Sequence, residues 1–406
     1  MIPLDQRVAA AAIFAVTYLV VAIGKLPVLR LDRAGAALLG AALMVATGVL
    51  TLDEAQRAID LNTITLLLSM MILVANLRLS GFFRVVTAWS VRRARHPLLL
   101  LTSIVLVSGL LSAFLVNDTI CLVLTPLVLE VVQRLRRNPV PYLLAIAMAS
   151  NAGSTATITG NPQNMIIGTV SGLGYGNFVL RLAPVAAIGL ALAVLLIAAL
   201  WPREFWTRER LFADPPPARP HRFMAGKTLA VAGALVVAFF AGVPPAKAAL
   251  VGGAVLLLTR TVKPEKVYAQ IDWTLLLMFA GLFVVVGGLE HAVLTPNVVA
   301  AVGRLHLQQA GALAAVTAAL SNLVSNVPAV LVLKPFVARL ADPARAWLVV
   351  AMASTMAGNL TILGSVANLI VVQRARAGGV AIGPWTHFRA GAPLTVLTIL
   401  AGVLLL

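Results

Sequence analysis

Two polar stretches interrupt long apolar runs of this chain, and their residue types could bind a small ion. Residues 150–164 read SNAGSTATITGNPQN without any charge, and residues 116–119 read VNDT, with Asp118 as the acid. Amide, hydroxyl and carboxylate oxygens are ligands for hard cations, whereas the free N–H groups of broken helices favour an anion. These stretches therefore indicate ion binding within a hydrophobic protein.

The composition places these residues in a lipid bilayer. Of the 406 residues, 60% are hydrophobic and 11% are charged, whereas a soluble domain carries about 25% charged residues. The apolar runs are long enough to span the hydrocarbon core of a membrane. The net charge of +17 does not indicate nucleic-acid binding, because the basic residues lie in short loops between these runs.

The chain contains two copies of one unit. AMASNAGSTATITGNPQN at 147–164 aligns without a gap with AMASTMAGNLTILGSVAN at 351–368, and AFLVNDTICLVLTP at 113–126 aligns with NLVSNVPAVLVLKP at 322–335. A charged, Pro-rich stretch separates the copies. We therefore expect a first repeat at 1–201, a cytoplasmic linker at 202–226 and a second repeat at 227–406.

The number of membrane crossings predicts how the copies are related. The run 98–133 is too long for one span and is broken at 115–119, so we interpret it as a re-entrant hairpin. The other helices of the first copy are expected at 7–24, 28–50, 61–79, 142–168 and 179–201. Five crossings, an odd number, turn the second copy upside down. The predicted fold is an all-α polytopic membrane protein of two inverted-topology repeats, each with five transmembrane helices, one re-entrant hairpin and a broken helix.

The basic residues predict the orientation. Most of the 31 Lys and Arg residues fall on one side, in the linker and in the loops 24–33, 78–97, 134–141, 260–272 and 372–389. By the positive-inside rule this side is cytoplasmic and both termini lie outside, in the cell inner (plasma) membrane. The basic, aromatic segment 81–95 is expected to form a helix at the cytoplasmic interface.

The breaks of both copies are expected to converge near the membrane midplane, because non-helical backbone is tolerated there only inside protein or beside an aqueous cavity. Na⁺ would be held by Asn117, Asp118 and Asn326. The candidate substrate- and ion-binding residues are Asn117, Asp118, Thr119, Ser154, Thr155, Thr157, Gly160, Asn161, Asn164, Ser325, Asn326, Asn359, Thr361, Gly364, Ser365 and Asn368.

Several polar residues have a structural alternative. Asp118 could cap the second arm of the hairpin, and the paired Asn residues could join packed helices. Asp60 and Asp272 are better interpreted as helix-start caps, and Lys334 as a side chain that reaches the outer surface. The five histidines lie in or beside loops without metal-ligand spacing, so no cofactor is expected apart from Na⁺ or H⁺ as a coupling ion.

The hairpin tips and broken-helix motifs resemble the ion transporter superfamily, which includes arsenite-efflux and sodium–proton antiporter permeases, citrate transporters and divalent anion–sodium symporters. The resemblance covers nearly the whole chain. The symporter branch carries Ser-Asn-Thr at each tip, whereas this chain keeps the Asn in VNDT (116–119) and SNVP (325–328). The resemblance implies a homodimer and an elevator motion of the hairpins and broken helices against a scaffold.

These features predict secondary active transport of a small anion, an oxyanion or a carboxylate, coupled to Na⁺ or H⁺. A Na⁺/H⁺ antiporter that uses Asp118 and an arsenite-type efflux permease are the alternatives. An enzyme would need a catalytic acid–base pair, a nucleophile or a metal cluster at membrane depth, and the sequence offers none. Closed hairpins also disfavour a channel.

Overall fold

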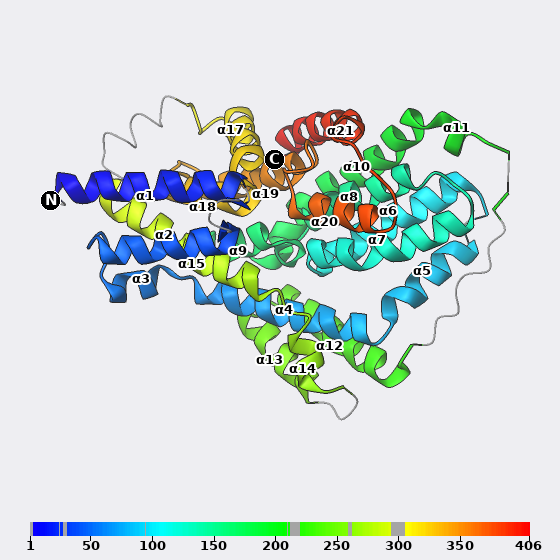
Figure 1. The fold of residues 1–406 in the computed structure, drawn as a ribbon, viewed down its shortest axis with the longest axis horizontal. Helices are drawn as coiled ribbons and strands as arrows, with labels where there is room; N and C mark the ends of the chain where they lie inside the picture. Colours follow the sequence, from blue (N-terminus) through cyan, green and yellow to red (C-terminus); the bar gives the residue numbers. More distant parts are fainter. Residues whose placement is uncertain are drawn as a thin grey trace.

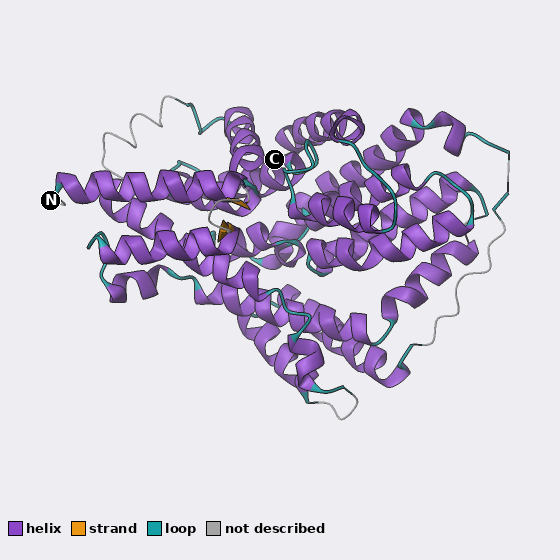
Figure 2. Cartoon of the chain, viewed as in Figure 1, coloured by secondary structure: helices purple, strands orange, loops and turns teal. Residues whose placement is uncertain are grey.

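The computed structural model describes residues 3–23, 25–26, 31–93, 95–208, 210–211, 220–258, 262–293 and 305–406. Helices dominate this part of the chain, and its sheet is the antiparallel pair β1 (Lys25–Leu26) and β2 (Leu31–Asp32) (Figure 2). The predicted helical architecture is confirmed. Parts of the predicted cytoplasmic loops and linker, namely residues 27–30, 212–219 and 259–261, lie outside the described residues.

The first copy consists of helices apart from the β1–β2 pair between α1 and α2 (Figure 1). They are α1 (Leu4–Ile23), α2 (Arg33–Ala46), α3 (Leu52–Ala58), α4 (Leu61–Leu79), α5 (Phe82–Arg93), α6 (Pro97–Phe114), α7 (Asn117–Arg134), α8 (Pro139–Ser154), the 3₁₀ helix η1 (Ile158–Gly160), α9 (Pro162–Val170) and α10 (Tyr175–Leu200). α6 and α7 meet where VNDT breaks the long run. α8 ends inside the polar stretch at 150–164.

The second copy repeats this order. After α11 (Pro202–Phe205) come α12 (Arg222–Phe240), α13 (Pro245–Leu257), α14 (Pro264–Tyr268), α15 (Trp273–Val293), α17 (Ala310–Val324), α18 (Asn326–Val337), α19 (Pro343–Ala357), α20 (Val366–Ala377) and α21 (Pro384–Leu405). α17 and α18 meet at Ser325, and residues 358–365 separate α19 from α20. α12 begins at Arg222, inside the segment predicted as linker.

Carboxylates fix the starts of several helices. The side chains of Asp32, Asp60 and Asp342 accept hydrogen bonds from the first backbone N–H groups of α2, α4 and α19. The Asp272 side chain accepts one from the N–H of Leu275 at 2.9 Å, in the first turn of α15. An oxygen at this position satisfies an N–H group that the helix itself leaves free. The prediction that Asp60 and Asp272 cap helices is confirmed.

The helices pack as two groups. Group A consists of α1 to α4 with α12 to α15, and group B consists of α6 to α10 with α17 to α21. Within group A, α2 packs against α15 and the equivalent α13 packs against α4. This exchange of equivalent contacts is typical of a two-fold relation between the copies. The inverted orientation of the second copy stays a prediction.

The surface of the helices fits a bilayer. Seven helices among the described residues are long and apolar enough to cross a membrane, namely α1, α4, α6, α10, α12, α15 and α21. Large apolar side chains project from them, with Leu180 on α10 73% exposed and Val237 on α12 70% exposed. α6 could therefore cross by itself, whereas its counterpart α17 has only 15 residues. The re-entrant hairpins and the five crossings per copy stay predictions.

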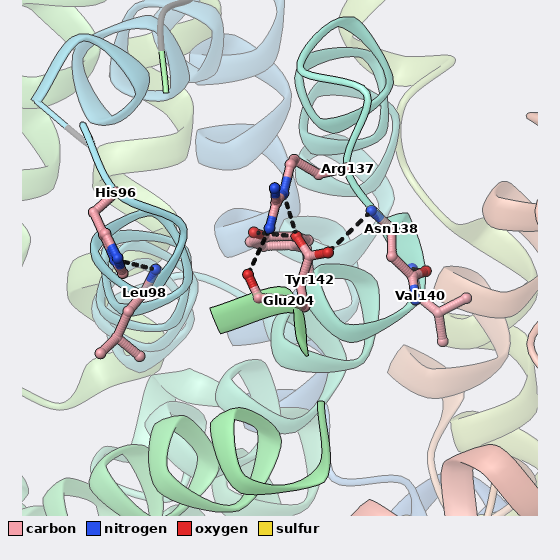
Figure 3. Close-up of polar contacts among 7 residues, drawn as sticks. All are labelled: His96, Leu98, Arg137, Asn138, Val140, Tyr142 and Glu204. Atoms are coloured by element: carbon pink, nitrogen blue, oxygen red, sulfur yellow. Dashed lines mark hydrogen bonds and ion pairs between the residues drawn. The ribbon is translucent and has the colours of Figure 1, made fainter. Parts of the chain in front are cut away.

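Glu204, on α11, anchors the segment after the first copy. Its Oε1 accepts hydrogen bonds from Arg137 Nε at 2.8 Å and from the Tyr142 hydroxyl at 2.9 Å (Figure 3). The Arg137 and Glu204 side chains are 12% and 11% exposed. Because Arg137 precedes α8 and Tyr142 lies in its first turns, this cluster fixes the start of α8 against α11.

Candidate functional site

A cavity lies between the two groups, where the breaks of both copies meet. It is narrow, with about 30 Å³ of room for water-sized groups. Group A contributes Val21, Arg33, Leu275, Met278 and Phe279, and group B contributes Asn117, Asp118, Pro162, Gln163, Ser325, Asn326, Val327, Pro328, Ser365 and Val366. Five of the predicted site residues thus line one cavity, namely Asn117, Asp118, Ser325, Asn326 and Ser365.

Four helices of group B begin at this cavity. Asn117, Pro162, Asn326 and Val366 are the first residues of α7, α9, α18 and α20, and all four line it. The starts of α7 and α18 carry no side-chain cap, so their first N–H groups are available to a ligand. Because a helix start carries about half a positive charge, this convergence favours an anion.

Ser325 connects α17 to α18 in an unusual backbone conformation. Its φ of 77° and ψ of 163° lie in a region that residues with side chains rarely adopt. Holding such a residue costs of order 1–3 kcal/mol, and the strain is concentrated at functional sites. The equivalent Val116 has a φ of −59°, so the two hairpin tips differ in structure.

Two charged side chains line the cavity from opposite groups. Arg33 comes from α2 and Asp118 from α7, and both are half-buried. Within the described part of the chain, neither side chain forms an ion pair or a hydrogen bond. The cap of α7 is Val116, without a side-chain bond, so the alternative in which Asp118 caps this helix is wrong. Both charges are available to ligands.

Asn151, on α8, connects the two copies behind the cavity. Its Nδ2 donates to Asn359 Oδ1 at 2.9 Å and to Asn368 Oδ1 at 3.2 Å. Its Oδ1 accepts from Asn117 Nδ2 at 3.2 Å and from Ser365 Oγ at 3.1 Å. All of the hydrogen-bonding capacity of this amide is used. The first hairpin tip is thereby coupled to the broken helix of the second copy.

Asn164 and Asn368 play matching parts at the two breaks. Asn164 Nδ2 donates to two carbonyls of the first break at 3.1 and 2.9 Å, and Asn368 Nδ2 donates to two carbonyls of the second at 2.7 and 2.9 Å. The acceptors are Ser154 and Thr157 in the first copy and Gly358 and Thr361 in the second. Each amide thus satisfies backbone groups that the break frees.

Other predicted residues of the first break lie in the wall behind the cavity. Thr155 Oγ1 donates back to the Asn151 carbonyl at 3.1 Å, and Asn161 Nδ2 donates to Ser154 Oγ at 3.0 Å. The Thr157 hydroxyl donates to the Ala113 carbonyl on α6. These residues shape the break and do not line the cavity.

The same holds for the second break. Thr361 Oγ1 donates to Asn322 Oδ1 at 3.2 Å, and a Cβ on Gly364 would lie 2.7 Å from that Asn322 oxygen. A Cβ on Gly160, the equivalent of Gly364, would lie 2.2 Å from the Ser154 carbonyl oxygen. Thr119 is half-buried and does not line the cavity.

Three buried amide atoms in and behind the cavity lining have no hydrogen-bond partner among the described residues, and of the three residues Asn117 lines the cavity. They are Asn117 Oδ1, Asn164 Oδ1 and Asn359 Nδ2. A buried polar atom without a partner is costly, so a ligand that pairs with it is stabilised. Asn117 and Asp118 are consecutive residues of α7 that both line the cavity, and both carry oxygen atoms of the kind that hard cations prefer.

Sequence reasoning missed Arg33, Asn151, Gln163 and His387 as site residues. His387, expected in or beside a loop, lies in the first turn of α21, and its buried ring has Nε2 3.0 Å from the Asn359 carbonyl oxygen. Asn151 and Gln163 lie inside the stretch at 150–164, which was the signal that could have found them. Arg33 was counted among the loop charges, although it is the first residue of α2.

Gln163 connects the first broken helix to the second copy. Its Nε2 lies 3.1 Å from Thr355 Oγ1. With the Asn326 amide oriented to donate to the Ser354 and Gly364 carbonyls, Gln163 Nε2 also donates to Asn326 Oδ1 at 3.2 Å. The start of α9 is thus tied to the tip of the second hairpin.

The apolar helices, the paired internal breaks and the polar cavity between two helix groups define a polytopic membrane transporter. The chain belongs to the citrate transporter family, because the family profile CitMHS: Citrate transporter matches residues 18–357. The predicted membership of the ion transporter superfamily is confirmed. The protein is therefore a secondary transporter and not an enzyme.

Similar proteins agree with this assignment over the whole chain. An uncharacterized transporter of Mycobacterium tuberculosis is 31% identical over 97% of this chain and 96% of its own. The silicon efflux transporter LSI3 of Oryza sativa subsp. japonica is 28% identical over 98% of this chain and 97% of its own. The YdaH transporter structure from Alcanivorax borkumensis shares the fold, with a TM-score of 0.62 and 17% identity over 99% of this chain and 96% of that one.

Proposed function

We propose that this secondary transporter carries a small anion, an oxyanion or a carboxylate, together with Na⁺ or H⁺. The observation that supports the substrate class is the convergence of four helix starts and the Arg33 side chain on one cavity. Backbone N–H groups and a guanidinium bind carboxylate and oxyanion oxygens through charge-assisted hydrogen bonds. The name of the family, citrate transporter, agrees with an anionic substrate.

Asp118 is the proposed binding site of the coupling cation. Asp118 lines the same cavity as the anion site, and so does Asn117, whose Oδ1 has no partner among the described residues. An anion entering this cavity is repelled by a charged Asp118, whereas a bound Na⁺ or H⁺ neutralises that charge. Cation and anion therefore favour each other's binding, and this coupling is reciprocal.

The proposed transport mechanism is an elevator-type alternation, in which group B carries the ligands past group A. The location of the cavity at the boundary between the groups supports this motion. The proposal includes two inverted repeats at 1–201 and 227–406, a homodimer, and an inner-membrane location with a cytoplasmic linker and outside termini. It rests on the internal duplication, on the loop charges and on the superfamily resemblance.

Asp118 also supports a second function, Na⁺/H⁺ antiport or arsenite-type efflux. Its carboxylate has no counter-charge in contact within the described residues, so it could exchange cations without an anion. Relatives named as a silicon efflux transporter and as the putative transporter arsB of Dictyostelium discoideum, which is 25% identical over 92% of this chain and 87% of its own, favour an efflux role. The two functions differ in whether ions move when no substrate anion is present.

Purified protein in liposomes loaded with a pH-sensitive dye separates these functions. Na⁺ and Li⁺ pulses are applied first as chloride salts, and then citrate, succinate, phosphate, arsenate or arsenite is added. The anion proposal expects no proton movement from Na⁺ alone, and anion uptake driven by a Na⁺ or H⁺ gradient. Asp118→Asn should abolish that gradient dependence, whereas Glu130→Gln, in an exposed pair with Arg134, should behave as wild type.

Two results would contradict the proposal. Proton movement by Na⁺ alone that disappears in Asp118→Asn would establish antiport in place of anion symport. Anion uptake with unchanged ion dependence in Asp118→Asn would remove Asp118 from the coupling site.

A further inference from the structure

We propose that Arg33 binds the transported anion on one face of the membrane only. This inference rests on the proposed function and adds a specific residue and a sidedness to the same cavity. Arg33 is the arginine among the residues that line the cavity. It belongs to group A, whereas the other polar lining residues belong to group B.

The packing of α2 fixes Arg33 to group A. Arg33 is the first residue of α2, and α2 packs against α1 and α15. Asp118, Asn326 and Ser365 reach the cavity from group B. If the two groups move relative to each other during transport, the anion stays with the helix starts of group B and meets Arg33 in one arrangement only.

Arg33 is free to bind an anion. It is half-buried and has no ion pair in the described residues. The adjacent Asp32 caps α2, with its Oδ1 accepting the Gly35 N–H at 2.8 Å, and forms no ion pair with Arg33 among the described residues. A partly desolvated guanidinium without a counter-charge is stabilised by an incoming carboxylate or oxyanion, which it can bind through two parallel hydrogen bonds.

The second copy has no equivalent guanidinium. AALLG at 36–40 aligns with AALVG at 248–252, which pairs Arg33 with Pro245, the first residue of α13. Lys247, two residues further, is exposed. The two-fold relation between the copies is therefore broken at this position. Because the two end states differ in this contact, the anion binds more tightly in the state in which the cavity faces Arg33.

Arg33 lines the cavity together with Leu275, Met278 and Phe279, which lie near the start of α15. A second hollow lies further along α15, at Phe283, and contains Asp60 and Lys334. The anion should thus be captured at lower concentration from the Arg33 face, which the loop charges predict to be cytoplasmic, than from the opposite face.

The test measures the anion concentration that half-saturates transport, separately on each face of the protein, in proteoliposomes of defined orientation. The probe is whichever of citrate, succinate, phosphate and arsenate the wild-type protein carries fastest. Arg33→Gln should raise this concentration about ten- to hundredfold on the Arg33 face and by less than about twofold on the other face. Arg33→Lys keeps the charge but not the two-pronged geometry, so its effect should be intermediate. Lys247→Gln is the matched control and should behave as wild type.

The outcomes separate this inference from the function on which it rests. An equal increase on both faces, or no increase, overturns the role of Arg33 and leaves anion transport intact. A wild-type protein that carries none of the four anions overturns the proposed function, and this inference with it. An unchanged half-saturating anion concentration on the opposite face shows that the Arg33→Gln protein is folded.

Discussion

Replacing Gly153 with alanine tests how closely α8 must approach α6 to build the site. Gly153 lies in the last turn of α8, and a Cβ at this position would be 2.1 Å from the Gly109 carbonyl oxygen and 2.5 Å from Gly109 Cα. Ordinary contacts begin at about 3.4 Å, so the two helices would have to separate by about 1.3 Å. The obstacle is backbone, which no side-chain rotation relieves.

The expected cost is about 1–3 kcal/mol, the usual range for overpacking a dense interior. The displacement would also act on function, because Asn151, two residues before Gly153, holds Asn117 and Asn359 in place. Gly153→Ala should therefore lower the melting temperature in detergent and reduce the rate of anion uptake per folded molecule.

Gly233→Ala, in the middle of α12, is the matched control. A Cβ there meets nothing within 4 Å, and alanine is the better helix former by about 1 kcal/mol. It should leave both uptake and melting temperature at or above the wild-type values. A Gly153→Ala protein with wild-type melting temperature and uptake would refute the close approach of α6 and α8.

Two further substitutions test the hydrogen bonds that hold the site. Asn368→Ala removes the side-chain donor of the Gly358 and Thr361 carbonyls; the Thr361 carbonyl still accepts from the Gly364 N–H, so the loss at Gly358 should cost about 1–3 kcal/mol. After Asn164→Ala the Ser154 and Thr157 carbonyls keep Asn161 Nδ2 and the Gly160 N–H as donors, so the detergent melting temperature should fall more in Asn368→Ala, and a larger fall in Asn164→Ala would contradict these hydrogen bonds. Glu204→Gln removes the carboxylate charge beside Arg137, which keeps its hydrogen bond to the Glu204 carbonyl, so it should destabilise the protein by about 1–3 kcal/mol in a denaturant titration. The exposed Glu130→Gln should change stability by less than about 0.5 kcal/mol; equal effects would show that the Glu204 cluster is solvated.

The order of helices could be predicted from the sequence, because it depends on local chemistry. Apolar runs give the helices, and Asn, Gly and Pro end them, so the breaks at VNDT and SNVP appear where the sequence has them. Capping by Asp60 and Asp272 follows from their place before apolar runs. Because the same segments occur in both copies, the sequence also predicted that polar residues from both copies contribute to one binding site.

The tertiary structure alone decided which polar residues face the cavity. Asn164 and Asp118 are both candidate ligands in the sequence, but Asn164 donates to the backbone of its own break, whereas Asp118 lines the cavity without a partner among the described residues. Arg33 looks like an ordinary loop charge and becomes a lining residue only because α2 packs against α15. Composition and periodicity determine whether a segment forms a helix and where that helix ends. The direction of a polar side chain depends on helices that are distant in sequence and meet only in the folded protein.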